Sequence, residues 1–148
     1  MQTDALDAAR AAYSLPDPRE MNPLQLAYLG DTLHDLYVRT RLAARHMSVG
    51  DMHRQAVRMV SAHAQACMLE AIGPELTQAE ADVARRGRNA QAKHAAPRHA
   101  DPADYAHATG LEALWGYLYA TGQITRLDAL INMAIARTED IWHRQNSK

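Results

Sequence analysis

The sequence of 148 residues contains one cysteine, Cys67, and no phenylalanine. A single thiol cannot form an intramolecular disulfide, and it excludes every zinc site that needs two thiolates. The apolar stretches end well short of the roughly 18 residues that suggest a membrane-spanning helix. Residues 1–10 are acidic and polar, unlike a secretory signal or a basic transit peptide. We therefore expect a soluble, cytoplasmic protein with one main domain that needs no disulfide or structural metal.

The sequence also lacks an excess of either charge, because 16 Lys and Arg residues balance 17 Asp and Glu residues to a net charge of −1. A strongly basic domain is the usual mark of a nucleic-acid binder, so the total argues against one. The charges are unevenly distributed, however. Residues 85–100 contain five basic and no acidic side chains, whereas residues 1–35 contain six acidic and two basic ones. Arginine outnumbers lysine 14 to 2, and its planar guanidinium suits bidentate contacts with phosphate.

Alanine and leucine are abundant, with 29 and 15 residues, and no convincing alternating strand pattern is present. Both are strong helix formers, so the composition predicts an all-α fold. Helix starts and breakers divide the chain into a short helix over 4–13, a helix over 23–46 that begins at Asn22-Pro23, and a long helix between Ser48 and Gly73-Pro74. Further helices are predicted over 77–88 and 101–122, with one or two more over 125–143. Residues 89–100 are predicted to form a loop.

The predicted helix over 23–46 has a polar row opposite an apolar stripe. Asp31 and Asp35 lie one turn apart in this row, where two like charges repel each other. The row is either a face exposed to solvent or a cation site, in which a bound cation would offset the repulsion between the two carboxylates. The apolar stripe consists of Leu26, Leu29, Leu33 and Leu36.

Glu112 is the only charged side chain between His107 and Arg126, and it lies in the apolar helix predicted after residue 101. Burial of a bare carboxylate is very costly. We therefore expect Glu112 to form a structural salt bridge or lie at an exposed edge, or else to serve as a metal ligand or catalytic acid.

Two segments resemble the acidic motifs of the ribonuclease III catalytic domain. Residues 24–31, LQLAYLGD, are similar to its LEFLGD motif, and residues 109–119, TGLEALWGYLY, are similar to its D-x-x-E-A-L-x-G motif. The glutamate of the first motif is Ala27 here, and the aspartate of the second is Thr109. Of the family's four carboxylates, this sequence keeps Asp31 and Glu112.

These departures are typical of the Mini-ribonuclease III subfamily, which lacks a double-stranded-RNA-binding domain. Its patterns AYLGD, HRxAVRxVSA, RRGRNA and TGxEALxGYLY occur here in order, at residues 27–31, 53–62, 85–90 and 109–119. The resemblance covers about residues 20–135, which we take as the catalytic domain. Residues 1–19 are then an N-terminal extension, and residues 136–148 are a C-terminal helical tail.

The resemblance implies an all-α endonuclease fold that acts as a two-fold homodimer. The apolar face of the helix that carries the first motif would contribute to the interface. Its candidate interface residues are Leu26, Leu29, Leu33 and Tyr37.

The resemblance also implies a Mg²⁺-dependent endoribonuclease that cleaves double-stranded RNA to 5′-phosphate and 3′-hydroxyl ends, with Mn²⁺ as a substitute metal. Asp31 and Glu112 would be the catalytic and metal-binding residues, and Asp35 and Thr109 are candidates for the outer coordination shell. The implied substrate is the precursor of large-subunit (23S) ribosomal RNA. A ribosomal protein that presents this substrate is compatible with the resemblance.

A catalytic domain without an accessory RNA-binding domain must contact RNA through its own surface. A-form RNA offers proteins its phosphates and 2′-hydroxyls, so the basic segment is the expected contact, extended by two arginines one turn apart. The expected RNA-binding residues are Arg54, Arg58, Arg85, Arg86, Arg88, Asn89, Lys93 and His94.

Two other functions stay open at this point. The loss of two acids suggests a non-catalytic RNA-binding or ribosome-assembly protein on the same fold, although the retained Asp31 and Glu112 argue against it. The pair His34-Asp35 suggests a metal phosphohydrolase of the HD type. The other histidines that such a site needs show no recognisable spacing.

Overall fold

The computed structural model describes residues 5–147, and every regular element in that range is a helix. The all-α prediction is therefore confirmed for these residues. Position 4, the predicted start of the first helix, lies outside them. The elements in chain order are α1 (Ala5–Tyr13), α2 (Pro23–Ala43), α3 (Val49–Val60), α4 (Ala62–Ile72), the 3-10 turn η1 (Gly73–Glu75), α5 (Gln78–Ala92), α6 (Pro102–Ala120) and α7 (Ile124–Asn146).

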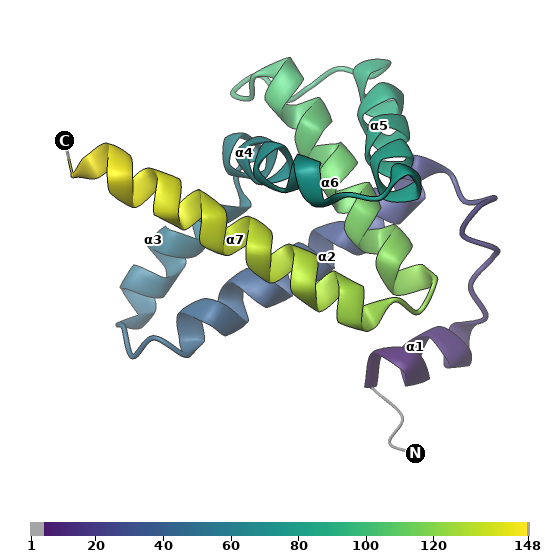
Figure 1. The fold of residues 1–148 in the computed structure, drawn as a ribbon, viewed down its shortest axis with the longest axis horizontal. Helices are drawn as coiled ribbons and strands as arrows, with labels where there is room; N and C mark the ends of the chain where they lie inside the picture. The colour runs from purple at the N-terminus through teal and green to yellow at the C-terminus, as the bar shows by residue number, and fades with distance from the viewer. Residues whose placement is uncertain (1–4, 148) are drawn as a thin grey trace.

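Helix α6 is the central element, since α2, α4, α5 and α7 all pack against it (Figure 1). Its apolar positions form the centre of the hydrophobic core. Leu111, Leu114, Trp115 and Leu118 are completely buried. The long helix α7, yellow in Figure 1, crosses in front of α2 in that view and covers this core. No helix in the described range is long and apolar enough to cross a membrane.

Glycines allow α2 and α6 to cross at close range. A β-carbon at Gly30 of α2 would overlap the backbone carbonyl of Glu112, and one at Gly116 of α6 would overlap the backbone carbonyl of Leu26. Each helix thus presents bare backbone where the other helix approaches most closely. The crossing fixes the positions of the residues next to these glycines.

Local capping explains where the helices begin. The Asn22 side chain accepts a hydrogen bond from the Leu24 amide at 2.9 Å, and the Gln25 side chain accepts one from the Asn22 amide at 3.1 Å. Such a capping box satisfies donors that a helix start leaves unpaired. The predicted start of this helix is therefore confirmed.

Two predicted boundaries are wrong. The long helix after Ser48 is two helices, because the backbone of Ser61 is extended (φ −61°, ψ 155°) and its hydroxyl caps α4 by accepting from the Ala64 amide at 3.1 Å. Helix α5 continues to Ala92, so the first residues of the predicted loop are helical. Alanine and glutamine are good helix formers, which lets α5 continue past Arg88. Helix α7 is single and passes position 135 without a break.

The apolar stripe predicted for α2 is rotated in the structure. Leu36 is 52% exposed, whereas Val38 and Leu42 are buried. The buried face turns toward Gly30, because α6 packs there. Leu26 and Leu33 are buried within this one chain, so of the four candidate interface residues these two belong to its core.

Candidate active site

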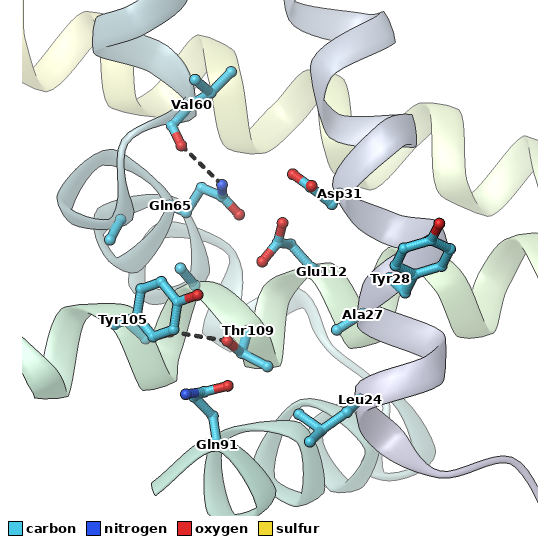
Figure 2. A pocket seen from close by; sticks show the side chains of 12 residues that line it. Leu24, Ala27, Tyr28, Asp31, Val60, Gln65, Gln91, Tyr105, Thr109 and Glu112 are labelled. Atoms are coloured by element: carbon cyan, nitrogen blue, oxygen red, sulfur yellow. Dashed lines mark hydrogen bonds between the residues drawn. The ribbon is translucent and has the colours of Figure 1, made fainter. Parts of the chain in front are cut away.

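The crossing of α2 and α6 brings Asp31 and Glu112 to one cleft (Figure 2). The cleft has a volume of about 380 Å³ and is formed by helices α2 to α6. Figure 2 shows the two carboxyl groups facing each other from neighbouring helices. The residues that line the cleft are Leu24, Ala27, Tyr28, Asp31, Val60, Ala62, Gln65, Gln91, Tyr105, Ala108, Thr109 and Glu112.

The environment of Glu112 favours its protonated form. Burial, followed by the hydrogen bond and the negative charge of Asp31, raises the pKa of Glu112 to about 9. No cation forms an ion pair with Glu112 within the described residues, as their ion pairs all involve other acids. The alternative of a structural salt bridge is therefore wrong. A strongly shifted carboxyl group in a cleft is typical of a functional site.

The opposed carboxyl groups suit a divalent cation. A cation between them replaces their mutual repulsion with attraction, and carboxylate oxygens are preferred ligands of hard cations such as Mg²⁺. Within residues 5–147, no group of three or more His, Cys, Asp or Glu side chains is placed to hold a metal. A cation held by Asp31 and Glu112 alone would take its further ligands from water or substrate.

The two positions at which the sequence departs from the acidic motifs, Ala27 and Thr109, both line the cleft. Thr109 is buried, and its hydroxyl donates a hydrogen bond to the Tyr105 carbonyl at 3.0 Å. Asp35 is not among the lining residues, and its carboxylate accepts a hydrogen bond from Arg39 at 2.9 Å. Of the two expected outer-shell residues, the structure therefore brings only Thr109 to the cleft.

Sequence reasoning missed two tyrosines and two glutamines that line the cleft: Tyr28, Tyr105, Gln65 and Gln91. Gln65 is 4% exposed, and its side-chain amide donates to the Val60 carbonyl at 3.0 Å. The available signal was one amide within the alanine-rich residues 62–72. That pattern does not reveal whether the amide faces solvent or the interior.

The basic segment lies beside this cleft. Arg88, Asn89 and His94 line a second hollow of about 340 Å³, and Gln91 and Tyr105 line both this hollow and the cleft. The end of α5 and the segment after it therefore form a continuous surface with the two carboxyl groups.

Some of the predicted RNA-binding arginines already contact an acidic or aromatic side chain of the protein, and others do not. Arg54 pairs with Asp51, and Arg85 pairs with Asp82 at 3.2 Å. The Arg58 guanidinium lies 4.0 Å from the centroid of the Trp142 ring, a cation–π contact. Among the described residues, the predicted arginines and lysine that form neither an ion pair nor a cation–π contact are Arg86, Arg88 and Lys93.

His34 does not belong to a metal site of the HD type, so that alternative is wrong. The ring is 1% exposed. Its Nδ1 accepts a hydrogen bond from the Trp115 indole at 3.2 Å, and its Nε2 donates to the Met59 carbonyl at 3.1 Å. Both nitrogens are thus used inside the core, and burial lowers the pKa of His34. The residue is a neutral connector between α2, α3 and α6.

Sequence comparison places the chain among ribonucleases. A model of the family described as Ribonuclease III domain matches residues 24–123. A Mini-ribonuclease 3 from Symbiobacterium thermophilum is 52% identical over 121 residues, which cover 81% of this chain and 92% of the relative. A Mini-ribonuclease 3 from Brevibacillus brevis is 43% identical over 124 residues, which cover 83% of this chain and 92% of the relative.

Structure comparison supports the fold. A crystal structure of a protein from Fusobacterium nucleatum superposes with a TM-score of 0.73 at 24% sequence identity. The match covers 82% of this chain and 98% of the other. The arrangement of helices around α6 is therefore shared with a solved protein.

Proposed function

This chain belongs to the ribonuclease III family and is an endoribonuclease, and we propose that it uses Mg²⁺ held by Asp31 and Glu112 to cleave double-stranded RNA in the cleft between α2 and α6. The family acts on double-stranded RNA and uses a divalent metal. The observation that carries the proposal is the pair of facing carboxyl groups at the helix crossing. Mn²⁺ is the expected substitute metal.

The residues of the cleft fit such a cation. When bound, Mg²⁺ lowers the pKa of water and stabilises the negative charge that develops on the cleaved phosphate. Asp31 and Glu112 would hold the cation, and Glu112 would release its proton to solvent when the cation binds. Thr109 lines the same cleft, and its hydroxyl is held within α6 by its hydrogen bond to the Tyr105 carbonyl. The expected products carry 5′-phosphate and 3′-hydroxyl ends.

We propose that the basic surface beside the cleft holds the RNA backbone. Arg86, Arg88 and Lys93 are the main cations, because within the described residues they carry neither an ion pair nor a cation–π contact. Asn89 and His94 add hydrogen-bonding groups along the same surface. Arg54, Arg58 and Arg85 are secondary RNA contacts, because Asp51, Trp142 and Asp82 already contact them.

We propose that two copies of the chain form a symmetric dimer through the exposed side of α2. Tyr28 is 82% exposed and Leu36 is 52% exposed, although both are large apolar residues, and Leu29 is partly exposed beside Tyr28. A two-fold dimer places two clefts in symmetric positions, so each cleft cuts one strand of a duplex. Sedimentation of the wild type and of Leu36→Glu tests this interface: the variant should sediment as a monomer.

The proposed cellular substrate is the precursor of 23S ribosomal RNA, which implies a cytoplasmic enzyme and allows a ribosomal protein to present the RNA. The support is the similarity to Mini-ribonuclease 3 relatives over most of the chain. In this proposal the catalytic domain spans residues 20–135, between the N-terminal extension and the C-terminal tail. The alternative of a non-catalytic ribosome-assembly protein is not supported, because the chain is an endoribonuclease.

One assay tests the catalytic proposal. The wild type, Asp31→Asn and Asp140→Asn are incubated with duplex RNA, with Mg²⁺ or with a chelator. Asp140 is an exposed residue of α7, so its variant controls for the loss of one negative charge. We expect the wild type and Asp140→Asn to cut only with Mg²⁺, and Asp31→Asn to be at least about 100-fold slower. Cleavage that persists in Asp31→Asn, or in chelator, rejects the proposal.

A further inference from the structure

The side-chain oxygen of Gln65 is a buried acceptor without a hydrogen-bond partner in the structure. The residue is 4% exposed and lies on α4 in the wall of the cleft. Buried polar atoms are nearly always paired with protein or ordered water. An unpaired acceptor that faces a cleft therefore indicates a group that binds there.

The hydrogen bond made by the Gln65 amide nitrogen fixes the orientation of the amide group. Its Nε2 lies 3.0 Å from the Val60 carbonyl. A carbonyl oxygen accepts but never donates, so the nitrogen must face Val60 and the oxygen must face the cleft. Figure 2 shows this oxygen pointing toward the Glu112 carboxyl group. The packing of α4 against α6 holds it there.

The Gln65 oxygen can serve as an acceptor of a hydrogen bond from a water bound in the cleft. Asp31 and Glu112 are its carboxyl groups, and position 27 contributes only a methyl group. The hydroxyl proton of Thr109 is donated to Tyr105. A neutral amide adds an acceptor to this site without adding a third negative charge. The cleft volume of about 380 Å³ is ample for water, which occupies about 30 Å³ in the liquid.

We propose that Gln65 is a positioning residue whose Oε1 accepts a hydrogen bond from a water molecule beside the cation that Asp31 and Glu112 hold. This inference rests on the proposed function, because it assumes that cation. Gln65 thereby orients a water whose other hydrogen-bond partners lie at the two carboxylates. Outer partners of this kind typically change metal affinity or activity by about 10- to 100-fold when they are removed.

The structure offers a matched control for this inference. Thr138 Oγ1 on α7 is the other unpartnered buried side-chain atom among the described residues. Thr138 is completely buried but does not line the cleft. Thr138→Val therefore removes an unpartnered oxygen from the core and leaves the cation site untouched.

The test measures Mn²⁺ binding to the full chain without RNA by electron paramagnetic resonance. The variants Gln65→Met and Gln65→Glu both lose the amide that donates to Val60, but only Gln65→Glu keeps an oxygen toward the cleft. We expect Gln65→Met to bind Mn²⁺ about 10- to 100-fold more weakly than the wild type. Gln65→Glu should bind at least about 10-fold more tightly, because a carboxylate is added next to the cation. Thr138→Val should bind as the wild type does.

Gln65→Met that binds Mn²⁺ as tightly as the wild type overturns the inference, and so does Gln65→Glu that binds no more tightly. If Gln65→Met does not fold, Gln65→Glu decides alone. Steady-state cleavage of duplex RNA supplies a second readout. Gln65→Met should lower kcat about 10-fold or more and change KM less than about 2-fold, because Gln65 contacts water and not RNA. A change confined to KM overturns the inference.

The controls separate failure of this inference from failure of the proposed function. If the wild type does not bind Mn²⁺, or if Asp31→Asn binds it equally well, the cation site itself is rejected. If Asp31→Asn loses Mn²⁺ while Gln65→Met keeps it, only the role of Gln65 is rejected.

Discussion

Gly30 of α2 lies directly against the backbone of Glu112 of α6, with no room between them for a β-carbon. Gly30 directly precedes Asp31, and Glu112 faces Asp31 across the cleft. The contact between Gly30 and Glu112 therefore lies next to both carboxyl groups. The backbone positions from which the two carboxyl groups extend are therefore set by a contact of main chain with main chain. Side chains of the core support this contact but do not define it.

The first prediction concerns Gly30→Ala. Alanine normally stabilises a helix interior relative to glycine, by roughly 0.5–1 kcal/mol. Here the added methyl group would overlap the Glu112 carbonyl and force the helices apart, which should cost about 1–3 kcal/mol or more. Urea unfolding measures the loss. Gly73→Ala is the control, because no atom lies within 4 Å of a β-carbon there. If the two variants are equally stable, α2 and α6 can move apart to admit the methyl group without a loss of stability, and the close contact at Gly30 is not essential.

The second prediction concerns Glu112→Gln without RNA. Because the pKa of Glu112 is about 9, the carboxyl group is protonated at neutral pH, and glutamine resembles that form. The variant should unfold at nearly the wild-type temperature in chelator. Mg²⁺ should raise the Tm of the wild type, since a ligand of the folded state stabilises it, and should leave the variant unchanged. The exposed Glu70 provides the control Glu70→Gln, which should respond as the wild type does.

The third prediction concerns RNA binding by the basic surface. Arg86→Ala and Arg88→Ala should weaken binding to duplex RNA and lower the dependence of log K on log salt by about one unit each. Arg85→Ala should have a smaller effect, because Asp82 already pairs with Arg85 at 3.2 Å. Arg19→Ala, which breaks an ion pair with Asp17 near the N-terminus, is the control. The assignment fails if the salt slope of Arg88→Ala equals that of the control.

The fourth prediction concerns the pH dependence of stability. The Arg126 guanidinium makes two hydrogen bonds of 2.9 Å to the Glu80 carboxylate, and it holds the pKa of Glu80 below its usual value. A carboxyl group with a lowered pKa in the folded state stabilises the protein above its unfolded pKa, about 4.3. This stabilisation is lost as the pH falls through the folded value.

Glu80→Gln tests that dependence. The variant should lose on the order of 1–2 kcal/mol of stability at pH 7. Its free energy of unfolding should then fall less steeply than that of the wild type as the pH drops below about 4. Denaturant unfolding across the acidic range measures both slopes. Parallel curves would show that other groups cause the acid sensitivity.

Local signals in the sequence predicted the beginnings of helices well. The Asn22-Pro23 and Thr77-x-x-Glu80 patterns lie within one turn of the starts that they mark, and both form capping boxes. The break at Ser61 was missed, because serine also occurs inside helices. Its extended backbone and its hydrogen bond from the Ala64 amide, which show that it caps a new helix, are visible only in the structure.

The carboxyl pair was found through motif resemblance, because Asp31 and Glu112 are far apart in the sequence. Gln65 was missed for a physical reason. Its role depends on burial and on the Val60 carbonyl, which follow from the turn between α3 and α4. Leu36 was placed on the wrong side of α2, since an ideal periodicity does not reveal which turn of the helix meets α6.

The reciprocal contact of Gly116 with the Leu26 carbonyl has a consequence for how this protein tolerates sequence change. With Gly30, it gives the helix crossing two fixed points that contain no side chains. Apolar substitutions elsewhere in the core then alter the overall stability while the crossing keeps its shape. We therefore expect substitutions of core side chains to change the stability of the protein more than they change the relative placement of Asp31 and Glu112.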